Sequence, residues 1–143
     1  MQEFDTPNVV YLEQSDISPS DYRLSSGGII NPVSGRPYFS GRSAVLIQGN
    51  YCGYCSQFKP VFQNVADDLS DRIDFATIRT DSPNPGEALF KGDALSQIIG
   101  MPLQGVPQVI KFQNGAPARL SNGQVDVFQG DRNESALKQW LAN

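Results

Sequence analysis

Two cysteines separated by two residues lie between an apolar run and a segment with helical periodicity, and this arrangement constrains the fold more than any other part of the chain. The apolar run at 44–47 predicts a short buried strand, and the pair follows after a Gly-Asn break as Cys52-Gly53-Tyr54-Cys55. The next apolar residues recur at spacings of three or four, which places them on one face of a helix: Phe58, Phe62, Val65 and Leu69. The sequence therefore predicts a dithiol at a strand-to-helix junction.

The two thiols are expected to differ in reactivity. Cys52 falls just before or within the first helical turn, where unpaired backbone N–H groups and the helix dipole favour negative charge. The thiolate is the reactive form of cysteine, so Cys52 is the expected nucleophile. Cys55 falls one turn inside the helix, close enough to form a disulfide with Cys52.

The composition narrows the class of protein. A chain of 143 residues is expected to form a single domain, 1–143, with 39% hydrophobic and 18% charged residues. Its net charge is −4 and it has no basic run, so nucleic acid is not expected as a partner. No apolar stretch approaches the length of a membrane span, so no membrane is expected either. The N-terminus has neither the basic nor the apolar region of a signal peptide, which makes a cytoplasmic location the expectation.

The cysteine and histidine counts limit the possible cofactors. The chain has 2 cysteines, both in the Cys-x-x-Cys pair, so a framework of several disulfides is excluded. It has 0 histidines, and two thiolates supply only half of a tetrahedral zinc site. No metal and no other cofactor is expected; a zinc site completed by carboxylates or shared by a dimer is the alternative.

The remaining elements follow an α/β order. We expect strands at 8–12, 72–79, 108–112 and 125–128, with turns at Asn114-Gly115 and at 121–123, and helices at 87–99 and 131–142. Asp131, three residues before Glu134, is the expected cap of the last helix, whose apolar face contains Leu137, Trp140 and Leu141.

Residues 13–43 form the least regular part of the sequence. Two short extended pieces around a turn are predicted at 29–39, where the prolines suit an edge or a loop. The segment is interpreted as a hairpin-like surface insertion. A docking element is the alternative, because Ile29, Ile30, Tyr38 and Phe39 are costly apolar residues on a surface.

The motifs together resemble the thioredoxin-fold oxidoreductases, the superfamily that includes thioredoxins and protein disulfide isomerases. The matching features are Cys52-Gly53-Tyr54-Cys55, Pro60 five residues later, Val106-Pro107, Asn114-Gly115 and the stretch from Phe128 to Arg132. The resemblance covers roughly 44–143 and, more weakly, the first strand. It implies a central mixed sheet of four to five strands flanked by helices, with 1–43 supplying the first strand and the insertion. It also implies that Pro107 is a cis proline beside the cysteines.

Two positions depart from the family pattern. The family keeps a buried carboxylate six residues before the first cysteine and a lysine facing it; here these positions are Leu46 and Thr77. Loss of both is coherent, because removing one alone would leave a buried charge unpaired. The carboxylate is credited in the family with taking a proton from the second thiol, so slower resolution is expected here.

The resemblance implies an enzyme that exchanges disulfides with protein disulfide or dithiol substrates. Cys52 and Cys55 would be catalytic. Substrate contacts would come from five residues, with Arg132 as a possible modulator: Tyr51, Gly53, Tyr54, Val106 and Pro107. The Gly-Tyr dipeptide suggests a reduction potential between about −270 mV, as in thioredoxin, and about −180 mV, as in protein disulfide isomerase. The net direction of electron flow, and the reductant or oxidant that serves as recycling partner, stay open.

Two other classes are kept as alternatives. One is a thioredoxin-fold binding module that uses its apolar rim and residues 29–39 without redox turnover. The other is a structural component of a larger assembly. Asn31-Pro32-Val33-Ser34-Gly35-Arg36 is similar to a stretch common in proteins of large DNA viruses, so a virion component is the alternative location.

Overall fold

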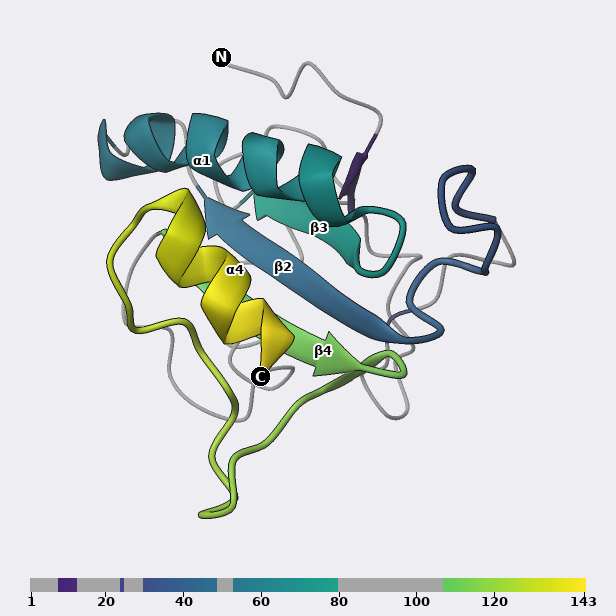
Figure 1. Cartoon of the computed structure of the whole chain (residues 1–143). Coiled ribbons are helices and arrows are strands. Elements are labelled where there is room, and N and C mark those ends of the chain that lie inside the picture. The colour runs from purple at the N-terminus through teal and green to yellow at the C-terminus, as the bar shows by residue number, and fades with distance from the viewer. Residues whose placement is uncertain (1–7, 13–23, 25–29, 49–52, 80–106) are drawn as a thin grey trace.

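The described part of the chain forms a mixed five-stranded sheet with the helices α1 and α4 on one of its faces (Figure 1). The computed structural model describes residues 8–12, 24, 30–48, 53–79 and 107–143. Its elements are β1 (Val9–Tyr11), β2 (Arg42–Gln48), α1 (Gly53–Leu69), β3 (Asp74–Arg79), β4 (Gln108–Gln113), β5 (Ala116–Pro117) and α4 (Glu134–Ala142). The predicted helix at 87–99 lies outside the described residues.

The strand order is β1-β3-β2-β4-β5. β3 pairs in parallel with both β1 and β2, and β4 runs antiparallel to β2 and β5. The strands expected at 8–12, 44–47, 72–79 and 108–112 are found as β1, β2, β3 and β4, with ends that differ by at most two residues. The five strands of the sheet agree with the expected four to five. β2 is the central strand of the sheet. Its carboxyl end and the start of α1 lie at the same end of the sheet (Figure 1).

The helix face of the sheet carries the core that supports the cysteine-containing helix. Alternation along β2 directs Ala44 and Leu46 towards this face, where they pack with Phe58 and Phe62 of α1. α4 adds Leu137 and Leu141 to the same cluster. The periodicity of Phe58, Phe62 and Val65 therefore predicted the buried face of α1 correctly.

The C-terminus of α4 is held by two basic side chains from the sheet. Arg42 donates from Nη1 to the carbonyl oxygen of Leu141 at 2.6 Å, and Lys111 donates from Nζ to that of Trp140 at 2.9 Å. The last carbonyls of a helix have no partner within the helix and carry partial negative charge. The two cations satisfy them and fix α4 against the sheet.

The cap of α4 differs from the sequence prediction. Asn133, not Asp131, is the N-cap, and its Oδ1 accepts a hydrogen bond of 2.8 Å from the Ala136 N–H. Asparagine and aspartate cap helices about equally well. Asn133 is the cap because it directly precedes the first helical residue. The helix begins at Glu134, which leaves Asp131 outside it.

The hairpin after β4 is also more complex than predicted. Asn114 and Gly115 have φ values of 53° and 84°, as the predicted tight turn requires. The returning strand begins at once as β5, and the chain then leaves the sheet as a protruding arm, residues 119–125 (Figure 1). It returns to pair with β4 through the Ile110–Val127 bridge. The predicted strand at 125–128 is thus the second half of an interrupted strand.

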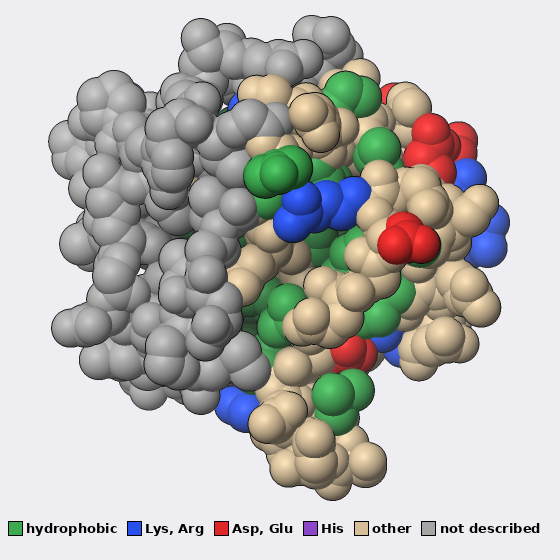
Figure 2. Space-filling view, turned by 90° about the vertical axis from the view of Figure 1, so that its left-hand side faces the viewer, with side chains coloured by type: hydrophobic (Ala, Val, Ile, Leu, Met, Phe, Trp, Pro, Cys, Tyr) green, Lys and Arg blue, Asp and Glu red, His purple; other side chains and the backbone are tan. Residues whose placement is uncertain are grey.

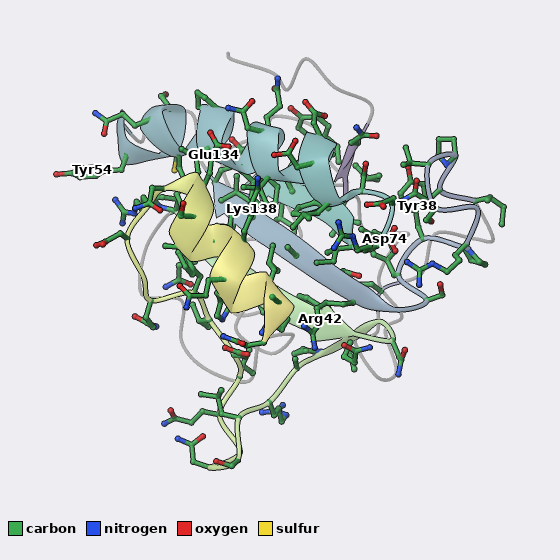
Figure 3. All side chains as sticks on the ribbon, in the orientation of Figure 1. Tyr38, Arg42, Tyr54, Asp74, Glu134 and Lys138 are labelled. Carbon is green, nitrogen blue, oxygen red and sulfur yellow. The ribbon has the colours of Figure 1, made fainter. Side chains whose placement is uncertain are left out.

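The insertion forms a compact loop at residues 30–41, closed by an Ile30–Pro37 bridge. Asn31 Nδ2 donates to the buried Asp74 carboxylate at 2.7 Å, and the Phe39 N–H donates to the same carboxylate at 2.8 Å. Figure 3 shows Tyr38 and Asp74 at this end of the sheet. Phe39 is buried, whereas Ile30 is 49% exposed. The antiparallel Ile30–Pro37 bridge gives this part of the insertion the hairpin-like form that was predicted.

Candidate functional site

The first turn of α1 positions the described half of the cysteine motif. Gly53 is the first residue of the helix, Tyr54 is 64% exposed and Cys55 is fully buried. Figure 3 shows Tyr54 projecting from the end of α1. Cys52 and Tyr51 lie outside the described residues. Within the described part of the motif, Tyr54 is thus presented to solvent and the Cys55 thiol is directed into the core.

Favourable conditions for a thiolate exist at this helix end. The first turn of α1 contains no acidic residue. The unpaired N–H groups of a first turn carry partial positive charge, which favours an anion just before the helix. Cys52 immediately precedes Gly53 in the chain, and its role as nucleophile stays a prediction.

Two polar side chains, Gln48 and Thr77, are hydrogen-bonded to each other in the core. Leu46 and Thr77 are partners in the β2–β3 register, and both are fully buried. Thr77 Oγ1 donates to the Leu46 carbonyl oxygen at 2.9 Å and accepts from Gln48 Nε2 at 2.8 Å. Gln48 was not singled out by the sequence analysis, although its place two residues after Leu46 puts it on the same face of β2. A neutral hydrogen-bonded pair is therefore present near the expected site of the carboxylate and lysine.

A pocket of about 220 Å³ lies one helical turn along from Cys55. Its walls come from α1, from the start of β4 and from the segment before α4: Phe58, Pro107, Gln108, Val109, Val127, Phe128, Gln129, Gly130 and Arg132. Pro107 is buried directly before β4, while Val106 lies outside the described residues. Pro107 and Arg132, two residues predicted for the site, therefore line one pocket.

The wall at 127–132 is held by aromatic and charged contacts. The Phe128 ring meets Phe58 edge-on, with 6.4 Å between centroids, and lies 5.3 Å from Trp140. Asp126, just before this wall, accepts from Trp140 Nε1 at 2.9 Å and pairs with the buried Lys111 Nζ at 3.1 Å. These contacts fix the segment that leads to Arg132.

Arg132 and Tyr54 meet at the rim of the pocket. The guanidinium carbon of Arg132 lies 5.2 Å from the centre of the Tyr54 ring. Figure 2, which looks on to this end of the molecule, shows a basic patch beside hydrophobic side chains. Of the predicted site residues, the structure thus brings Tyr54 into contact with Arg132, which lines the same pocket as Pro107.

No metal site is evident among the described residues, where no three His, Cys, Asp or Glu side chains cluster in a way that could hold an ion. Among the described helices, none is long and apolar enough to cross a membrane.

No protein-family model matches the chain. The zinc-bound form of human ERp44 superposes with a TM-score of 0.58 at 15% identity, over 94% of this chain and 31% of ERp44. The J-Trx1 fragment of ERdj5 superposes with a TM-score of 0.60 at 13% identity, over 96% of this chain and 50% of that fragment. The chain thus spans less than a third of ERp44 and half of the ERdj5 fragment.

A thioredoxin of similar size also matches. A mutant thioredoxin from Halobacterium salinarum NRC-1 superposes with a TM-score of 0.50 at 24% identity, over 71% of this chain and 73% of that thioredoxin. At these identities the comparisons establish the architecture. The chain has a thioredoxin fold.

Proposed function

We propose that this chain is a thiol–disulfide oxidoreductase that works through Cys52 and Cys55. The observation that carries the proposal is the burial of Cys55 in the first turn of α1, in a thioredoxin fold, three residues before Phe58, which lines a pocket together with Pro107. A buried second thiol, protected from external disulfides, is suited to attack only a neighbouring sulfur. The first thiol, before the helix, would meet the substrate.

The proposed reduction proceeds in two exchanges. The Cys52 thiolate attacks one sulfur of the substrate disulfide; that bond breaks and the departing thiolate takes up a proton. Cys55, after losing its proton, attacks the Cys52 sulfur, which releases the second substrate thiol and leaves a Cys52–Cys55 disulfide. Two electrons pass from the protein to the substrate, and an external dithiol restores the reduced pair. In reverse, the same steps oxidise a substrate dithiol.

Substrate binding is assigned to the residues around the thiols. Val106 would offer its backbone N–H and C=O to an extended substrate segment, with Pro107 keeping that edge of the chain free. Tyr51 and Tyr54 would form an apolar rim, and Gly53 would leave room for the substrate backbone. Partners of this kind are protein disulfides and dithiols.

A redox titration tests this proposal. The protein is equilibrated in thiol–disulfide buffers, its thiols are trapped with a maleimide reagent, and the fraction oxidised is measured against potential. We expect a reversible two-electron transition between about −270 and −180 mV. Cys52→Ser should abolish it. Absence of a transition in the wild type would leave no redox function for the pair.

A binding module is the second candidate, and one observation favours it. Ile30 and Val33 are 49% and 50% exposed on the loop at 30–41, which a hydrogen bond from Asn31 to Asp74 ties to the sheet. Exposed apolar side chains on a fixed loop suit contact with another protein. A chain that binds through this loop without redox turnover would fail the titration above, which separates the two candidates.

A further inference from the structure

Arg132 is a positively charged group held in place beside the predicted thiol site. Its guanidinium carbon lies 5.2 Å from the centre of the Tyr54 ring. In the chain, Arg132 directly follows the segment 127–131, whose Phe128 packs on Phe58 and Trp140. A cation–π contact of this kind leaves most of the five guanidinium N–H donors for another partner. Because the ring already restricts the side chain, binding an anion there costs less side-chain entropy than at an unrestrained arginine.

Arg132 has no carboxylate partner within the described part of the chain. The ion pairs there join Arg72 with Asp71, Lys111 with Asp126, and Lys138 with Asp68. Asp131, its neighbour in sequence, does not pair with it. Glu134 is engaged with Asn64, whose Nδ2 donates to its carboxylate at 3.1 Å. The positive charge of Arg132 is thus available to a ligand.

The pocket behind Arg132 offers polar groups to a ligand, and none of its described lining residues is acidic. Among its described lining residues Arg132 alone is charged, and Gln108 and Gln129 add neutral amide groups. Its volume of about 220 Å³ is below the roughly 300 to 1,000 Å³ of pockets for drug-sized ligands. The pocket therefore suits a single side chain of a larger substrate better than a separate cofactor.

The loop that carries Arg132 depends on a glycine. A Cβ at Gly130 would lie 3.0 Å from Cε1 and 3.2 Å from Cζ of the Phe128 ring. Phe128 in turn packs on Phe58 and Trp140, so the ring has little freedom to move. The close approach of Gly130 to Phe128 shapes the pocket and the position of Arg132.

From these contacts we propose that Arg132 selects substrates with a carboxylate next to the disulfide that is exchanged. An acidic side chain beside the substrate cysteine enters the pocket and accepts charge-assisted hydrogen bonds from the guanidinium. Tyr54 acts as a positioning residue that holds the guanidinium over the rim. This inference rests on the proposed function, whose chemistry supplies the disulfide.

The test measures the first exchange alone. In a Cys55→Ser background, the rate of mixed-disulfide formation is followed by mass spectrometry with two peptide disulfides. In one peptide the cysteine is flanked on both sides by Glu, and in the other by Gln. Each rate is divided by the rate of the same peptide with 2-mercaptoethanol, a neutral thiol, because flanking carboxylates alter the intrinsic reactivity of a disulfide.

The expected Glu-to-Gln ratio of normalised rates is about five, typical of one solvent-exposed ion pair. Arg132→Gln should reduce the ratio to about one, and Tyr54→Leu should reduce it in part. Arg119→Gln is the matched control. It removes the same charge from the protruding arm, where Nη1 of Arg119 donates to the Gly123 carbonyl oxygen at 3.0 Å, and should keep the ratio.

The outcomes separate the two proposals. Equal normalised rates for both peptides, or a ratio that survives Arg132→Gln, would overturn the role of Arg132 and leave thiol–disulfide exchange standing. A ratio lost equally in Arg119→Gln would assign the preference to overall charge and overturn the inference as well. If neither peptide forms an adduct, the proposed function fails, and the selectivity built on it fails with it.

Discussion

The side-chain amide of Gln48 donates a hydrogen bond of 2.8 Å to the hydroxyl of Thr77 within the buried core. That hydroxyl donates in turn to the backbone of Leu46, its register partner on β2. Thr77 thus acts as donor and acceptor at once, and no charge is needed at this position. The proposed exchange therefore lacks, at Leu46 and Thr77, the buried carboxylate and lysine of the oxidoreductases that the sequence resembles.

This arrangement predicts the effect of restoring the acid. Leu46→Asp should speed the attack of Cys55, because a carboxylate there can accept its proton. A tenfold gain would correspond to about 1.4 kcal/mol of barrier. It should also lower the free energy of unfolding, since the buried carboxyl group would lack the usual lysine. The measurements are disulfide reduction across about pH 6 to 9, which spans thiol ionisation, and the thermal midpoint.

Leu46→Asn is the control for this change. It has nearly the same shape as Asp and also buries a polar group, but it cannot take up a proton. If Leu46→Asp stays folded and reduces disulfides no faster than Leu46→Asn, a missing base does not limit resolution.

The cap of α4 gives a second prediction. Asn133→Ala removes the 2.8 Å bond from the Ala136 N–H and should cost about 1 kcal/mol in the free energy of unfolding. Asp131→Ala lies outside the helix and should change stability little. Urea denaturation of both variants compares them directly. A larger loss for Asp131→Ala would restore the capping box that the sequence pattern suggested.

A third prediction concerns the loop at 30–41. Asn31 donates to the buried Asp74 carboxylate and to the Ser70 carbonyl oxygen, and its Oδ1 accepts from the Val33 N–H. Asn31→Ala should therefore lower the free energy of unfolding by about 2 kcal/mol, because a buried charge loses a hydrogen-bond donor. Ser34→Ala, which removes one exposed contact with the Arg36 N–H, is the matched control. Equal effects of the two would show that Asn31 does not anchor the loop.

A fourth prediction concerns pH. Burial, and next the nearby Asp74 carboxylate, raise the pKa of Tyr38 above its usual 10.0. The folded state then holds the phenol proton more tightly than the unfolded state does. The resulting contribution to stability is complete below about pH 10 and is lost as the pH rises through the folded-state pKa.

Tyr38→Phe should remove this component, so the free energy of unfolding should fall less steeply above about pH 10 than in the wild type. Denaturation at a series of pH values measures the slopes. Tyr54→Phe, at an exposed tyrosine, is the comparison. Identical slopes for wild type and Tyr38→Phe would contradict the raised pKa.

Local patterns predicted the elements of this fold well, because each depends on residues close in sequence. The spacing of Phe58 and Phe62 is set by the helix period, and the Asn114-Gly115 turn by backbone conformations that few residues adopt. Contacts between distant segments were not predictable. Gln48 meets Thr77 only through the β2–β3 register, and Arg132 meets Tyr54 only because the segment before α4 lies against the start of α1.

Choices between chemically equivalent groups were also not predictable. Asn133 and Asp131 offer the same kind of cap, and the structure uses Asn133 for a helix whose Leu137 and Leu141 are buried against the sheet. Asp126, where the chain returns to the sheet after the protruding arm, is bound by the backbone N–H and the side chain of Lys111 on β4. Neither residue signals this from its own sequence neighbourhood.

Peptide mapping of the first exchange tests thiol–disulfide chemistry most directly. The reduced wild type, Cys55→Ser and Cys52→Ser proteins are each mixed with an excess of one peptide disulfide, quenched with acid and mapped by mass spectrometry. We expect the wild type to end with a Cys52–Cys55 disulfide and an equal amount of reduced peptide. Cys55→Ser should stop with the peptide attached to Cys52, and Cys52→Ser should carry almost none. Equal labelling of both variants, or a wild type that keeps both thiols while the peptide stays oxidised, would contradict the account.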